Sequence, residues 1–75
     1  MDDELLSEQV QVERKVFSFS LCENPHGRFL RITEDVGGHR DTVIIPACGL
    51  TRIRGVLDRA IQADQKAGQA LVHEE

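Results

Sequence analysis

The sequence predicts an α+β domain in which a four-stranded antiparallel sheet is followed by one C-terminal helix, in the order β-β-β-β-α. Over the first part of the chain, hydrophobic residues alternate with polar ones, which is typical of half-buried strands. Turn-forming residues interrupt this alternation. From Gly49 onward the hydrophobic residues recur every three or four positions, which is the spacing of an amphipathic helix.

The first two strands are expected on either side of a charged bend. The first strand is expected at residues 5–12, where Val10 and Val12 alternate with Gln9 and Gln11, and the Glu-Arg-Lys segment at 13–15 interrupts the pattern. Residues 16–22 show the clearest alternation in the chain. One side of that strand carries Phe17, Phe19 and Leu21, and the other carries Ser18, Ser20 and Cys22. This two-residue period predicts a strand with one buried face.

A tight turn is predicted at residues 23–27, because Asn tolerates a left-handed backbone, Pro fixes φ and Gly has no Cβ. The third strand is expected at residues 28–34, with Leu30 and Ile32 directed toward the core. Its other side carries Phe29, Arg31 and Thr33. A large aromatic on the polar side of a sheet usually contacts a ligand or a partner.

A second hairpin and a helix complete the expected fold. The Gly-containing loop at 35–40 leads into a β-branched strand at 41–46, where the final proline suits a strand end. The helix is expected from Gly49 to about Lys66, and we expect it to cover one face of the sheet. Its apolar stripe consists of Leu50, Ile53, Leu57, Ala60 and Ile61. The sheet side of the core consists of Phe17, Phe19, Leu21, Leu30 and Ile32.

The chain is expected to form one domain at residues 5–67, between an acidic tail at 1–4 and a C-terminal tail at 68–75. A chain of this length buries only about 60% of its unfolded surface, so its core is marginal. The first strand is also left exposed at the edge of the sheet. Both features predict self-association.

The formal charge is −4, but the charges are unevenly distributed. Seven of the nine Lys and Arg residues, but only four of the thirteen Asp and Glu residues, lie between Arg14 and Arg54. The middle of the chain can therefore offer a basic face to nucleic acid. An excess of positive charge of this size also arises by ordinary scatter. Charge alone therefore does not show whether the middle of the chain binds nucleic acid.

Several other classes of protein are disfavoured. Cys22 and Cys48 form no C-x-x-C pair, so reduced thiols are expected and not a disulfide framework. No residue spacing indicates a metal site or a catalytic arrangement, so we expect no metal, no cofactor and no enzymatic activity. No apolar run approaches the roughly 20 residues of a membrane span, and the acidic N-terminus is unlike a targeting peptide, so a cytoplasmic location is expected.

The decapeptide at 23–32, ENPHGRFLRI, combines a tight turn with two arginines and an aromatic. Guanidinium and aromatic groups together grip a phosphate backbone and stack a base. This segment resembles the KxNxRGRFLRI-type signature of the PUR repeat, the module of the purine-rich-element-binding (PUR-alpha) proteins. The segment TVIIPACGL also looks like the last strand and helix start of that repeat. The resemblance covers about residues 5–66.

The resemblance implies a strongly curved sheet packed on a helix, in an intertwined pair of repeats that exchange their C-terminal helices. Bacterial relatives carry one repeat and form homodimers, and this chain looks like that type, with a nucleoid association if it is bacterial. The family binds single-stranded, purine-rich DNA and RNA without catalysis, and it can separate the strands of a duplex. A regulatory role follows by resemblance.

The residues expected to bind nucleic acid are Arg14, Lys15, Asn24, His26, Arg28, Phe29 and Arg31. By resemblance, the first two follow the bend of the sheet, Asn24 and His26 occupy the turn, and Phe29 wedges between neighbouring bases. The four residues Arg14, Lys15, Arg28 and Arg31 are expected to hold phosphates on the open sheet face.

Each assignment has an ordinary structural alternative. Phe29 can pack against a partner subunit or a neighbouring strand, Asn24 can cap its own turn, and each cation can be merely solvated. Two departures from the family pattern also matter, because Cys22 stands where lysine is common and His26 where arginine is common. They motivate the alternative that the domain is a dimerisation or protein-interaction module with little affinity for nucleic acid.

Overall fold

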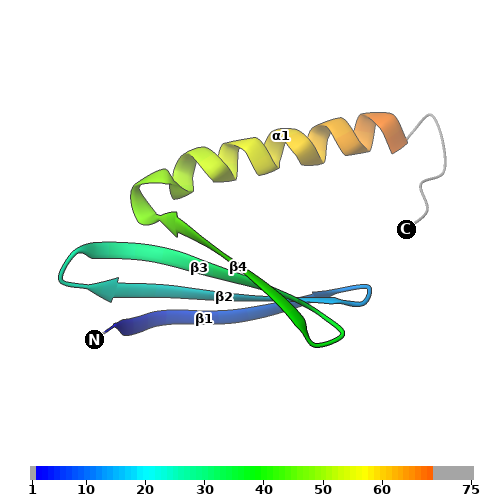
Figure 1. The fold of residues 1–75 in the computed structure, drawn as a ribbon. Helices are drawn as coiled ribbons and strands as arrows, with labels where there is room; N and C mark the ends of the chain where they lie inside the picture. Colours follow the sequence, from blue (N-terminus) through cyan, green and yellow to red (C-terminus); the bar gives the residue numbers. More distant parts are fainter. Residues whose placement is uncertain (1, 69–75) are drawn as a thin grey trace.

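The computed structural model describes residues 2–68, and within them four strands are followed by a short 3-10 helix and one α-helix (Figure 1). The strands are β1 (Asp3–Val12), β2 (Lys15–Asn24), β3 (Gly27–Val36) and β4 (His39–Pro46). The helices are a short 3-10 helix, η1 (Ala47–Gly49), and α1 (Leu50–Gly68). The β-β-β-β-α order of the single chain is therefore confirmed.

The strands form one antiparallel sheet in the order β1-β2-β3-β4. Two-residue turns join them at 13–14, 25–26 and 37–38. Glu13, Gly37 and Gly38 have φ values of 57°, 59° and 89°, because a tight hairpin needs a left-handed backbone to match the twist of its strands. The predicted loops at 23–27 and 35–40 are shorter than expected, since main-chain pairing continues beyond the hydrophobic alternation.

Strand β1 begins at Asp3, before the expected start of the first strand at residue 5. Asp3 pairs with Glu23 and Glu4 pairs with Cys22, and a bulge follows before Leu6. Charged residues are tolerated here because β1 is an edge strand, where one side of the backbone faces solvent. The sheet therefore includes part of the segment that we expected to be an acidic tail.

The strand register divides the sheet into two faces, because cross-strand partners lie on the same side. The apolar face carries Leu6, Val10, Phe17, Phe19, Leu21, Leu30, Ile32, Val43 and Ile45. The polar face carries Gln9, Ser18, Ser20, Cys22, Phe29, Arg31, Thr33 and Thr42. The predicted sides of the residues in β2 and β3 are confirmed.

Helix α1 lies above the apolar face but does not close onto it (Figure 1). Ile53, Leu57 and Ile61 are 40%, 58% and 54% exposed, and Val43 on the sheet is 56% exposed. The prediction that the helix covers the sheet of its own chain is therefore wrong. The short η1 turn carries the start of α1 away from the end of β4, so α1 contacts the rest of the chain mainly through η1.

Residues 2–68 consequently form no hydrophobic core of their own. Within residues 2–68, Cys22 on the polar face is the only hydrophobic residue that is buried, at 3% exposure. The radius of gyration is 15.2 Å, whereas a compact domain of this length has a value of about 11 Å. Over the same residues, no helix combines the length and the hydrophobicity that a bilayer-spanning segment requires.

Candidate nucleic-acid interface

The β2–β3 turn fixes Asn24 at one end of the sheet. Its Oδ1 atom accepts a hydrogen bond from the backbone N–H of His26 at 2.9 Å, and Gly27 follows with a φ of 134°. This is an Asx-type turn, so the capping role of Asn24 is present in the structure. The Nδ2 amide donates to Oδ1 of Asp2 at 3.2 Å. Asn24 therefore serves the turn with its oxygen and offers a hydrogen-bond donor with its nitrogen.

Next to this turn, the polar face carries an aromatic side chain beneath a cation. The guanidinium carbon of Arg31 lies 5.6 Å from the centre of the Phe29 ring, within cation–π distance. Its Nη1 atom lies 3.8 Å from the Sγ atom of the buried Cys22. Phe29 is half-buried, and the side chain of Arg31 keeps 41% of its surface exposed. The pair thus offers solvent an aromatic ring and a positive charge together.

Asp2, which we did not assign to the site, contacts both the guanidinium of Arg31 and the side-chain amide of Asn24. The carboxylate of Asp2 places Oδ2 at 3.7 Å from Nη2 of Arg31 and Oδ1 at 3.2 Å from Nδ2 of Asn24. Nearby, Glu4 accepts a hydrogen bond from the hydroxyl of Ser20 at 2.7 Å. An anion therefore already occupies the position between the amide and the guanidinium.

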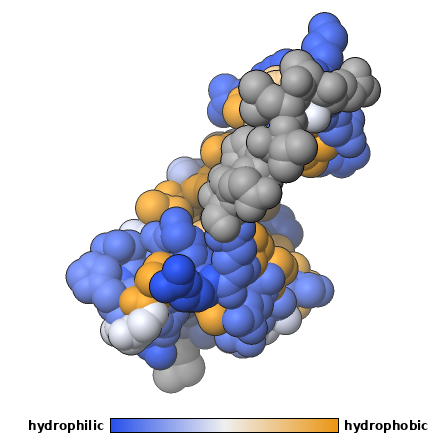
Figure 2. All heavy atoms as spheres, turned by 90° about the vertical axis from the view of Figure 1, so that its right-hand side faces the viewer, coloured by the Kyte–Doolittle hydropathy of each residue, from blue (hydrophilic) through white to orange (hydrophobic). Residues whose placement is uncertain are grey.

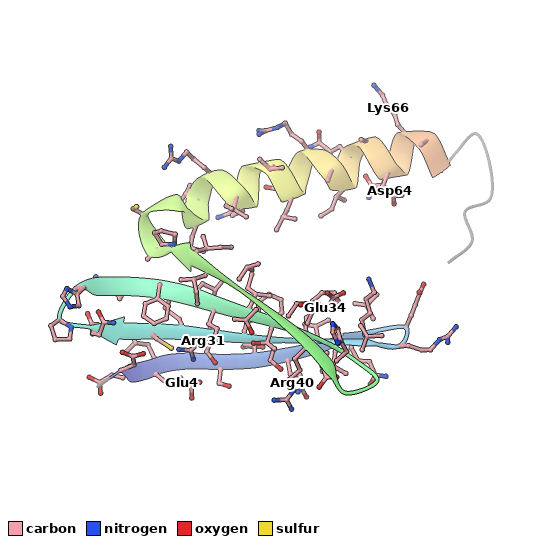
Figure 3. All side chains as sticks on the ribbon, in the orientation of Figure 1. Glu4, Arg31, Glu34, Arg40, Asp64 and Lys66 are labelled. Carbon is pink, nitrogen blue, oxygen red and sulfur yellow. The ribbon has the colours of Figure 1, made fainter. Side chains whose placement is uncertain are left out.

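Two of the expected phosphate-binding residues lie on the opposite face. The register places Arg28 beside Glu23 and Lys15 beside Val36 on the apolar face. Arg28 pairs with Glu23 at 3.6 Å, and Lys15 pairs with Glu34 at 3.1 Å. Figure 3 shows Glu34 on the side toward α1, and Arg31 and Glu4 on the side away from it. The expectation that the four cations share the open face is therefore wrong, because a spacing of three along β3 reverses the side.

Arg14 is also far from the turn that holds Asn24. It occupies the β1–β2 turn, at the other end of β2. A ten-residue strand is about 30 Å long, so Arg14 and Lys15 lie about that distance from Asn24. Arg31 lies between these ends, because it pairs with Ser20 in the middle of β2. The β1–β2 turn lies at the same end as the β3–β4 turn, because Lys15 and His39 both pair with Val36.

His26 and Arg28 face the start of the helix. They line a hollow of about 780 Å³ together with residues of β2, η1 and the first turn of α1. The structure therefore brings Asn24, Phe29 and Arg31 together on the polar face. It places His26 and Arg28 beside them at the turn, but toward the apolar side.

The model of the PurA family, described as a PurA single-stranded DNA- and RNA-binding protein, matches residues 1–73. This chain belongs to the PurA family. The PUR-repeat resemblance of the sequence is confirmed, and with it a non-catalytic, single-stranded nucleic-acid-binding domain. In this chain the ENPHGRFLRI segment spans the end of β2, the β2–β3 turn and the first part of β3.

A curated relative supports the same family. The PurA chain is 48% identical over 50 residues to the protein named Transcription factor Pur-alpha 1 of Arabidopsis thaliana. That match covers 67% of this chain but only 17% of the plant protein. The chain thus spans a small part of the length of this relative.

Proposed function

We propose that this PurA chain binds single-stranded, purine-rich DNA or RNA as a homodimer, with local strand separation and a regulatory role. The observation that carries the proposal is the group of Phe29, Arg31 and Asn24 on the polar face. Phe29 stacks on a base and inserts between it and its neighbour. Arg31 holds the adjoining phosphate, and the Asn24 amide donates to a base edge.

The large exposed surface of the single chain, much of it apolar, supports the homodimer. The chain exposes 6406 Å², whereas a compact protein of 8.4 kDa exposes about 4,600 Å². Figure 2 shows hydrophobic surface on the sheet and on the helix. An excess of this size matches the area that each partner of an obligate dimer buries.

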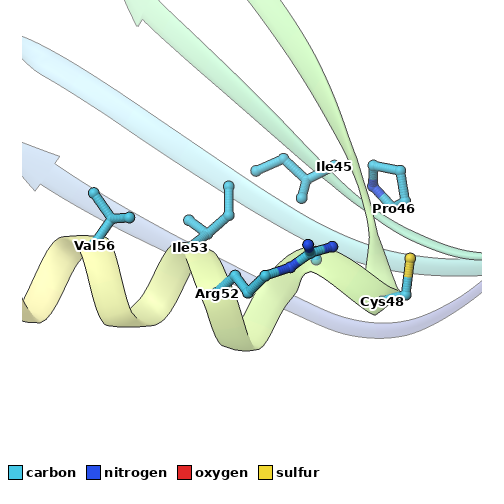
Figure 4. A pocket seen from close by; sticks show the side chains of 7 residues that line it. Ile45, Pro46, Cys48, Arg52, Ile53 and Val56 are labelled. Atoms are coloured by element: carbon cyan, nitrogen blue, oxygen red, sulfur yellow. The ribbon is translucent and has the colours of Figure 1, made fainter.

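A groove at the start of the helix supports an exchange of helices. It measures about 440 Å³, and its lining from β4, η1 and α1 is mainly apolar but includes Arg52 (Figure 4). Ile53 and Val56 of α1 lie opposite Ile45 of β4, with no chain segment between them among the described residues. A second copy that places its own helix on this apolar face fills the groove and buries both stripes.

The positions of the other cations support a path for the nucleic acid between the two ends of the sheet. Arg28 lies next to the β2–β3 turn, and Lys15 lies next to the β1–β2 turn. Both side chains thus lie at the ends of the sheet, where a nucleic-acid strand that passes round a turn can contact them. Arg31 provides the contact on the polar face itself, and Arg14 provides one at the β1–β2 turn.

The first test of the proposed function is the salt dependence of binding. We expect a fluorescent G-rich single strand of about 12–24 nucleotides to bind, with log affinity falling linearly against log salt. The slope should be near −0.7 for each phosphate that the protein neutralises. Fluorescence anisotropy across a salt series measures it. No affinity at low salt would reject the proposal and favour a protein-interaction module. The contacts of Asp2 with Arg31 and Asn24 are consistent with that alternative, because they occupy groups that would otherwise bind nucleic acid.

The contacts of Asp2 predict that its removal strengthens binding. In Asp2→Asn the side chain loses the charge that competes with a phosphate for Arg31. We expect roughly two- to fivefold tighter binding at low salt, since an exposed ion pair of this kind is weak. The salt slope should steepen by about 0.7, because one more cation becomes available.

Asp3→Asn is the matched control for this prediction. It removes the same charge from the next residue. Asp3 pairs with Glu23 across the strands, so its side chain belongs to the apolar face, opposite Arg31. The two variants therefore share any general effect of lowering the negative charge. Equal affinities of the two variants would show that Asp2 does not compete with the nucleic acid.

A further inference from the structure

A second polar hollow lies on the polar face, at the end of the sheet away from Phe29. It has a volume of about 190 Å³, and all four strands contribute to it. Its walls are Gln9, Val16, Ser18, Thr33, Asp35 and Arg40. The strand register places all six on the same side of the sheet as Phe29 and Arg31. The hollow exceeds the roughly 30 Å³ share of one water several-fold, so it has room for a planar group.

One wall of the hollow holds an acceptor and a donor side by side. Oδ2 of Asp35 accepts from Nε of Arg40 at 3.1 Å, and Oδ1 accepts from the backbone N–H of Gly38 at 3.0 Å. A carboxylate has about four acceptor sites, so both oxygens keep capacity for a ligand. The side chain of Asp35 is 30% exposed and that of Arg40 is 72% exposed. A fixed carboxylate thus stands next to an accessible guanidinium.

The other residues of the hollow add neutral groups that form hydrogen bonds. Nε2 of Gln9 lies 3.4 Å from the hydroxyl of Ser18, and the hydroxyl of Thr33 lies 3.3 Å from that of Thr42, which is next to the hollow. Val16 provides an apolar contact within the same hollow. Polar groups around one small apolar patch are suited to a nucleobase, which has polar edges and an apolar face.

The hollow also lies on the path that the proposed function requires. Along β3, the polar face presents Phe29, Arg31, Thr33 and Asp35 in turn. The distance from the first to the last is about 20 Å for an extended strand. A nucleic acid that is stacked on Phe29 and continues toward Arg14 therefore crosses the hollow.

We propose that this hollow is a second base-binding site that selects guanine. The Asp35 carboxylate accepts from N1–H and the N2 amino group of guanine, and the Arg40 guanidinium donates to O6 on the same edge. Adenine presents an acceptor at N1 and an amino group at C6, so the carboxylate faces a lone pair, the guanidinium faces a donor, and neither hydrogen bond to the base forms. This inference rests on the proposed function, because it names the base that the same face selects.

The variant Asp35→Asn tests the site without removing the turn. Asparagine keeps a side-chain oxygen for the N–H of Gly38 but loses the negative charge and one acceptor. Asp41→Asn is the matched control, since Asp41 lies on the same hairpin but pairs with Glu34 on the apolar side. Circular dichroism and thermal melting of both variants establish that the fold is kept.

The measurement is anisotropy with G-rich and A-rich single strands of equal length. We expect Asp35→Asn to lose roughly fivefold or more in affinity for the G-rich strand, while affinity for the A-rich strand is unchanged or higher. Asp41→Asn should change both affinities by the same small factor. An unchanged ratio of G-rich to A-rich affinity in Asp35→Asn would overturn the guanine site while leaving the proposed function intact.

A second measurement uses the wild-type protein and does not depend on the stability of a variant. In amide NMR spectra, the G-rich strand is expected to shift the signals of Asp35 and Gly38 more than the A-rich strand does. Signals that respond only near Phe29 would also overturn the site. If wild-type protein binds neither strand at low salt, the proposed function itself fails, and the guanine site fails with it.

Discussion

Replacing Phe29 by alanine is expected to weaken binding of a G-rich single strand by about 1–3 kcal/mol, on the order of 5- to 150-fold. The reason is that the Phe29 ring is the aromatic surface beside the exposed guanidinium of Arg31, so its loss removes both the stacking of a base and the support of the cation. Anisotropy titrations of the wild type and the variant at one low salt concentration measure the difference.

The variant Phe29→Leu separates stacking from simple hydrophobic packing. Leucine keeps an apolar side chain at this position on β3 but has no π face for a base. If Phe29 acts by stacking, Leu and Ala weaken binding to a similar extent while the protein stays folded. If Phe29→Leu binds like the wild type, the ring packs within the protein and the stacking mechanism is wrong.

A charge in the apolar stripe of α1 is expected to abolish the homodimer. In Ile61→Asp, a side chain that is 54% exposed in the single chain becomes charged at the place where we propose that a second copy buries it. Loss of a buried isoleucine alone costs about 2–5 kcal/mol, and the symmetry of a dimer doubles the effect. Because the sheet then has no cover, we expect the variant to be largely unfolded where the wild type is folded.

Analytical ultracentrifugation and melting at several protein concentrations test this expectation. The wild type should sediment as a dimer, with a melting temperature that rises with concentration. Gln62→Asp is the control, because it introduces the same residue one position along, on the side of the helix away from the stripe. Equal mass and equal melting of the two variants would contradict the exchange of helices.

Much of the fold could be predicted because each strand carries its own periodicity. In β2, the alternation of Phe17, Phe19 and Leu21 with small polar residues specified which side is apolar, and the register confirms it. In α1, the spacing of the hydrophobic residues predicted the helix to within a few residues of its ends. These signals are local, so they do not depend on the rest of the chain.

The position of the helix could not be predicted from the same signals. An apolar stripe shows that a helix packs one side against another apolar surface, but it does not show whether that surface belongs to the same chain or to a second one. The stripe of α1 and the apolar face of the sheet each have the composition of a buried surface. Only the geometry of η1 reveals that they do not meet within one chain.

The part of the candidate site that follows from local periodicity was predicted, and the part that depends on strand pairing was not. Phe29 and Arg31 are two positions apart on a strand, so their shared face followed from the sequence. Arg28 is three positions from Arg31, and the same two-residue period separates them, which the expectation of one cationic face overlooked. Asp2 could not be found, because its contacts depend on the pairing of β1 with β2.

The bulge in β1 has a consequence for the solubility of the protein. Strand β1 lies at the edge of the sheet, where one row of backbone N–H and C=O groups has no neighbouring strand. Such an edge is a template for cross-β growth, in which copies of the chain add strand after strand. The extra residue between Glu4 and Leu6 breaks the regular spacing of that row, and the carboxylates of Asp3, Glu4 and Glu8 repel a like-charged copy. The strand that brings Asp2 to the candidate site thus also protects its own edge of the sheet against amyloid-like association.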